Sequence, residues 1–82
     1  MLHIVANPEG LASCENALQA KDSVVFAGDA AYSAKTTDCA ATFVIDLDRK
    51  GRGLETPEGV TCISYDEFVD LIVATERSIT WA

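Results

Sequence analysis

Three cysteines are the residues of this chain whose side chains could carry covalent chemistry: Cys14, Cys39 and Cys62. A thiolate is both a nucleophile and a metal ligand. An odd number of cysteines without short spacing is typical of neither a disulfide framework nor a zinc site. We therefore expect three reduced thiols, no metal site and no cofactor.

Cys14 is the strongest candidate for a reactive thiol. It falls about one turn into a predicted helix that begins near Gly10, where unpaired backbone amides favour a thiolate. The neighbouring Glu15 acts in the opposite direction, because it disfavours a second negative charge. The alternative is a small core residue in an apolar stripe with Leu11 and Leu18, and these features alone favour that alternative.

The other polar candidates carry weaker signals. Cys39 lies in a loop-like stretch, and Cys62 falls inside a predicted strand, where a core position is the simplest reading. His3 is expected to be a structural histidine with its hydrogen bonds satisfied, and a general base only as the alternative. The basic run 49–52 is expected to be a solvated loop. Trp81 fits either a clamp onto the sheet or an anchor at an interface.

Short apolar runs alternate with helical patterns along the whole chain. The runs at 2–6, 23–27, 43–45 and 60–63 predict strands, and the segment 78–82 has extended propensity. Helices are predicted at 11–20 and 65–75, the second behind a capping box of Ser64 and Glu67. This βαβ pattern predicts one α/β domain over residues 1–82. We expect a small three-layer α/β/α Rossmann-like fold with a mainly parallel sheet of four or five strands.

The stretch 23–32 predicts a buried strand, a tight turn and a helix start. Gly28 can adopt a positive φ angle and Asp29 can cap the following helix, which is expected within 29–35. Such a turn lies at the carboxyl edge of a parallel sheet, where ligands usually bind. A further short helix is possible around 48–53. The few short helices leave apolar surface of the predicted sheet uncovered, so we expect the chain to oligomerise.

Charge and hydropathy exclude several classes of function. The chain of 82 residues has 13 acidic and 6 basic residues, a net charge of −7, which argues against direct binding of nucleic acid. Its apolar runs are too short to span a membrane. The start of the sequence has no basic flank and no apolar core of a signal peptide, so we expect a cytoplasmic protein.

Four segments in a consistent order resemble the DsrH/TusB family of small sulfur-relay proteins, within the DsrE/DsrF/DsrH-like superfamily. They are the opening Met1-Leu2-His3, the strand and acidic turn of 23–32, the element Gly51-Arg52-Gly53-Leu54, and the helix around 63–71 followed by Trp81. The last is similar to the family's Tyr-x-x-Phe-Val-x-Leu helix and near-terminal tryptophan. Two features depart from the family pattern: Asp29-Ala30 replaces Asp-Gly, and the segment before Phe43 is shorter.

The resemblance implies a subunit of a cytoplasmic complex that passes persulfide sulfur toward 2-thiolation of the tRNA wobble uridine. The alternative is a DsrH-type subunit in dissimilatory sulfur oxidation. The implied partners are DsrE- and DsrF-like (TusD- and TusC-like) subunits in a heterohexamer and a downstream sulfur acceptor, and a homo-oligomer when the chain is expressed alone. Tyr65, Phe68 and Trp81 are the interface candidates.

Some members carry a Ser-Cys pair in helix one, which Ser13-Cys14 matches, so the resemblance marks Cys14 as a candidate catalytic persulfide carrier. Otherwise the chain is a non-catalytic structural subunit. It is expected to be a sulfur carrier or sulfurtransferase subunit rather than a stand-alone enzyme.

Overall fold

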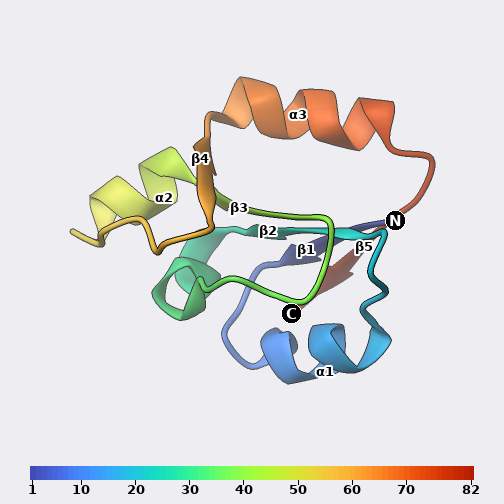
Figure 1. Ribbon diagram of the computed structural model, residues 1–82. Coiled ribbons are helices and arrows are strands. Elements are labelled where there is room, and N and C mark those ends of the chain that lie inside the picture. Colours follow the sequence, from blue (N-terminus) through green and yellow to red (C-terminus); the bar gives the residue numbers. More distant parts are fainter.

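The computed structural model describes all 82 residues and arranges five strands in one parallel sheet (Figure 1). The spatial order is β4-β3-β2-β1-β5, and every neighbouring pair is parallel. In chain order the elements are β1 (Leu2–Val5), α1 (Gly10–Ala17), β2 (Ser23–Phe26), the 3-10 helix η1 (Gly28–Ser33), β3 (Ala41–Ile45), α2 (Asp46–Gly51), β4 (Thr61–Ile63), α3 (Tyr65–Ala74) and β5 (Ser78–Trp81). The predicted fold class is confirmed, and the C-terminal segment supplies the fifth strand.

Helices cover both faces of the sheet, with α1 and α3 on opposite sides (Figure 1). Strand side chains alternate between the faces, so each of β1 to β4 contributes to two separate apolar clusters, whereas β5 adds Trp81 to one of them. The cluster beneath α1 and η1 contains Val5, Cys14, Val24, Phe26, Ala30, Ala31, Val44 and Val60. The cluster beneath α3 contains Leu2, Val25, Ile45 and Ile63, with Phe68 and Leu71 of the helix packed against it. Burial on both faces explains why the strands are continuous apolar runs.

The connection between β4 and β5 defines the topology. The first four strands follow one another across the sheet, whereas α3 carries the chain from β4 at one edge back to β5 at the other. There β5 pairs with β1, so that Leu2 faces Ser78 and Val5 faces Trp81. Two elements that lie more than 70 residues apart in the sequence are therefore adjacent strands.

Local signals explain how several elements start. Ser64 accepts a hydrogen bond from the Glu67 amide, and the Glu67 side chain accepts one from the Ser64 amide, so the predicted capping box at α3 is confirmed. Gly28 adopts a φ of 56°, as predicted for the turn after β2.

Two local predictions were wrong. Asp29 does not cap the helix after β2. Ala27 occupies the cap position without a side-chain hydrogen bond, and Asp29 lies in the first turn, where Arg52 pairs with it. The basic run 49–52 is not a solvated loop. Most of it belongs to α2, so the short helix expected around 48–53 is present and begins two residues earlier, at Asp46. Arg49 and Lys50 pair with Asp46 three and four residues earlier, which adds to the stability of this helix.

Candidate functional site

Cys14 lies on the inner face of α1 and is fully buried. Its exposed fraction is 0 %, and it packs in the cluster with Val5, Phe26 and Ala30. Leu11 and Leu18 pack against the same cluster, as the apolar stripe predicted. The thiol therefore sits one turn into a helix that begins at the carboxyl edge of the sheet, but it points into the core.

The surroundings of Cys14 oppose ionisation of its thiol. Burial is the largest cause, and the negative charge of Glu15 adds to it, with smaller effects from Cys39 and Asp22. Together they raise the pKa of Cys14 from 9.0 to about 11. Since the thiolate is the nucleophile, this environment makes Cys14 a weak one at neutral pH.

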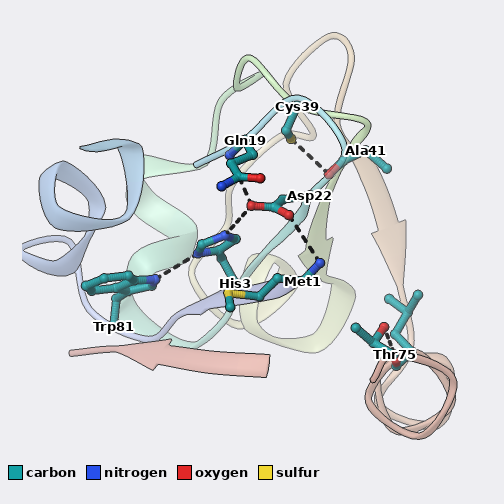
Figure 2. Close-up of polar contacts among 9 residues, drawn as sticks. Met1, His3, Gln19, Asp22, Cys39, Ala41, Thr75 and Trp81 are labelled. Carbon is teal, nitrogen blue, oxygen red and sulfur yellow. Dashed lines mark hydrogen bonds and ion pairs between the residues drawn. The ribbon is translucent and has the colours of Figure 1, made fainter. Parts of the chain in front are cut away.

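The other two thiols lie on the same face of the sheet as Cys14. Cys39 and Cys62 are half-buried and pack against the cluster that contains Cys14, which the sequence did not predict because the three come from a helix, a loop and a strand. Cys39 donates to the Ala41 carbonyl at 3.2 Å (Figure 2). Its sulfur also lies 3.0 Å from the Thr37 hydroxyl. No group of three or more His, Cys, Asp or Glu side chains is placed to hold a metal ion.

A polar rim closes the carboxyl edge of the sheet, and Asp48 is its centre. The Asp48 carboxylate accepts a hydrogen bond from the Gly28 amide at 2.8 Å and one from the Tyr65 hydroxyl at 2.8 Å. Arg52 donates to the Asp48 carbonyl at 3.0 Å and to the Asp29 carboxylate at 2.7 Å. The hydrogen bond to Asp48 raises the pKa of Tyr65, and that to Asp29 raises the pKa of Arg52. Both oxygens of the Asp48 carboxylate accept protein donors, whereas the Asp29 side chain remains 71 % exposed. The hydrogen bonds of Asp48 therefore join η1, α2 and α3.

A second polar network connects the N-terminal strand to the C-terminal strand (Figure 2). The Trp81 indole N–H donates to Nδ1 of His3 at 3.0 Å, and Nε2 of His3 lies 2.9 Å from the Asp22 carboxylate. An indole can only donate, so Nδ1 accepts and Nε2 carries the proton that bonds Asp22. Both His3 nitrogens are satisfied, which confirms the structural histidine, and Trp81 acts here as a clamp on the sheet.

Asp22 is the residue of this network that the sequence reasoning missed. It is 3 % exposed, and it also accepts hydrogen bonds from the Gln19 amide and the Met1 amino group. The His3 hydrogen bond is the main reason that the pKa of Asp22 falls from 3.8 to about 2, and the other two donors contribute in the same direction. The available signal was an acidic residue directly before a buried strand.

The two remaining interface candidates lie on α3 and differ in exposure. Tyr65 is 44 % exposed and carries the hydrogen bond to Asp48. Phe68 is half-buried and packs on the sheet, so most of its ring is in the core. The other large apolar side chains that α3 exposes are Val69, Ile72 and Val73.

A family model described as DsrH like protein matches residues 6–78 of the 82-residue chain. The chain belongs to the DsrH-like family. The match includes Cys14, the carboxyl-edge rim and all of α3, and the parallel α/β fold agrees with the small Rossmann-like domain expected from the resemblance. A comparison of this DsrH-like chain with curated proteins gives no match. None of its helices has the length and apolar composition needed to cross a membrane.

Proposed function

We propose that this chain is a subunit of a sulfur-relay complex and that it acts through assembly rather than by carrying sulfur on Cys14. Membership of the DsrH-like family supports the relay. The observation that carries the structural role is the complete burial of Cys14, whose pKa is raised to about 11. The thiol of a persulfide carrier must be accessible to a sulfur donor and to a sulfur acceptor. A thiol that is fully buried in the core is accessible to neither.

The proposed pathway is the delivery of persulfide sulfur toward 2-thiolation of the tRNA wobble uridine, in the cytoplasm. The resemblance of 63–71 and Trp81 to the DsrH/TusB pattern supports it. Dissimilatory sulfur oxidation is the alternative pathway for the same type of subunit. The net charge of −7 supports a role beside a partner that touches the tRNA, rather than direct contact with the nucleic acid.

The proposed partners are DsrE- and DsrF-like subunits, and co-expression with them tests the proposal. A tagged chain is expected to co-purify with both, and its removal is expected to lower the 2-thiouridine content of the tRNA. The variant Cys14→Ala is the decisive comparison, since it removes the thiol but keeps a small apolar side chain. We expect it to assemble and to support normal 2-thiouridine levels.

Each alternative gives a different result in the same experiment. If Cys14→Ala assembles normally but delivers no sulfur, the thiol is the carrier and the structural role is wrong. If the chain co-purifies with neither subunit, the relay itself is contradicted. If removal of the chain leaves 2-thiouridine unchanged but impairs sulfur oxidation, the second pathway replaces the first.

A further inference from the structure

The outward side of α3 carries a stripe of exposed apolar side chains. The stripe consists of four side chains with these exposed fractions: Tyr65 44 %, Val69 54 %, Ile72 36 % and Val73 80 %. Spacings of four, three and one residues place these four side chains along one stripe of the helix, which adjoins the side that Phe68 and Leu71 pack on the sheet. We call these four residues the α3 stripe. A contiguous apolar surface of this kind marks an interaction site more often than scattered exposed residues do.

The α3 stripe is held in a fixed shape. The capping box of Ser64 and Glu67 secures the start of the helix, and the Thr75 side chain and amide both donate to the Leu71 carbonyl at its end. Phe68 and Leu71 pack the adjoining side of the helix on the sheet. A rigid helix loses little conformational entropy when a partner binds, so this surface is prepared for docking.

The charged residues on α3 itself are all acidic, and Arg52, which lies near the Tyr65 end of the stripe, is already paired with Asp29 and Asp48. Asp66, Glu67 and Asp70 are the charged residues of α3, which contains no lysine or arginine. A second copy of this chain would place the same carboxylates against each other, and such pairs of like charge are destabilising. Lysine or arginine beside an apolar seam would instead match this border.

We propose that the α3 stripe binds an amphipathic helix of a different protein, whose apolar seam is bordered by lysine or arginine. A helix seated in this way would pack apolar residues spaced three and four apart against the stripe, with its basic residues near Asp66 and Asp70. The proposal goes beyond the sulfur relay, because it identifies the partner by its surface chemistry and holds whatever pathway the chain serves.

Two synthetic helical peptides test the proposal against the full chain. Both carry a leucine seam at spacings of three and four, but one has lysine beside the seam and the other has glutamate. The double variant Val69→Ser with Val73→Ser removes the centre of the stripe. Leu47→Ser is the matched control, since Leu47 is a 63 % exposed apolar residue on α2. Nuclear magnetic resonance maps the contact, and cooperative unfolding confirms that each variant is folded.

The lysine peptide is expected to shift resonances of residues 65–73 and to bind the double variant about tenfold more weakly. Leu47→Ser is expected to bind as the wild-type chain does, and the glutamate peptide is expected not to bind. Equal binding of both peptides, or shifts spread over all acidic surfaces, would overturn the proposal. Sedimentation that shows self-association through α3, abolished by the double variant, would overturn it as well, in favour of the homo-oligomer.

Discussion

The Asp22 carboxylate accepts three hydrogen bonds, from the His3 ring, the Gln19 amide and the Met1 amino group. The sequence indicated that His3 is buried and structural, but it did not indicate its partners. Asp22 and Trp81 lie 19 and 78 residues away in the sequence, and only the sheet brings them together. The apolar environment of Cys14 was predictable, in contrast, because Leu11 and Leu18 lie at helical spacing from it in the sequence.

Replacement of Asp22 by asparagine is expected to remove a pH dependence of stability. The pKa of Asp22 is about 2 in the folded chain against 3.8 ordinarily. A lowered pKa stabilises the folded state above about pH 4, and the contribution of about 2 kcal/mol is lost as the pH falls toward 2. Urea unfolding between pH 2 and 7 measures it. The difference in unfolding free energy between wild type and Asp22→Asn should shrink as the pH falls, and a constant difference would contradict this role.

The contact between α1 and β5 depends on one glycine at the start of the helix. A Cβ atom at Gly10 would lie 2.7 Å from the Trp81 carbonyl oxygen and 2.8 Å from its carbon, and both are backbone atoms that cannot rotate away. The small residue therefore allows α1 to approach the last strand. The sequence predicted Gly10 only as the approximate start of the helix, because the strand that it touches is at the other end of the chain.

Gly10→Ala is expected to destabilise the fold by about 1–3 kcal/mol, because α1 or β5 must move to admit the methyl group. Gly51→Ala is the matched control. Nothing lies within 4 Å of a Cβ atom there, and the residue ends α2 without a positive φ angle. Thermal and urea unfolding of both variants measure the effect. Gly51→Ala should be neutral or slightly stabilising, and a similar loss in both variants would rule out the close approach as the cause.

Elements with strong local signals were predictable, and those fixed by distant contacts were less so. The apolar runs marked the first four strands, and Ser64 with Glu67 marked the start of α3. The helix after β2 begins at Gly28 without a side-chain cap, because Ala27 occupies the cap position, and Asp29 in the first turn pairs with Arg52. The basic run lies mostly in α2, where Arg49 and Lys50 pair with Asp46, an acidic residue that the loop prediction did not take into account.

At the scale of the whole molecule, the sheet brings the two ends of the chain together and places all three thiols on one face. The carboxyl edge, where parallel sheets usually bind ligands, is closed by the rim around Asp48. Four of the eight exposed large apolar side chains lie together on α3. This distribution supports a protein that works through its surfaces, as a subunit of the proposed relay would.

The state of Cys14 after exposure to a persulfide donor tests this account most directly. Mass spectrometry with peptide mapping detects the addition of one sulfur, about 32 Da, to each cysteine of the folded chain. We predict no addition at Cys14 in the wild-type chain or in the double variant Cys39→Ser with Cys62→Ser. An adduct that persists in that double variant and disappears in Cys14→Ala would contradict the account and make Cys14 a sulfur carrier.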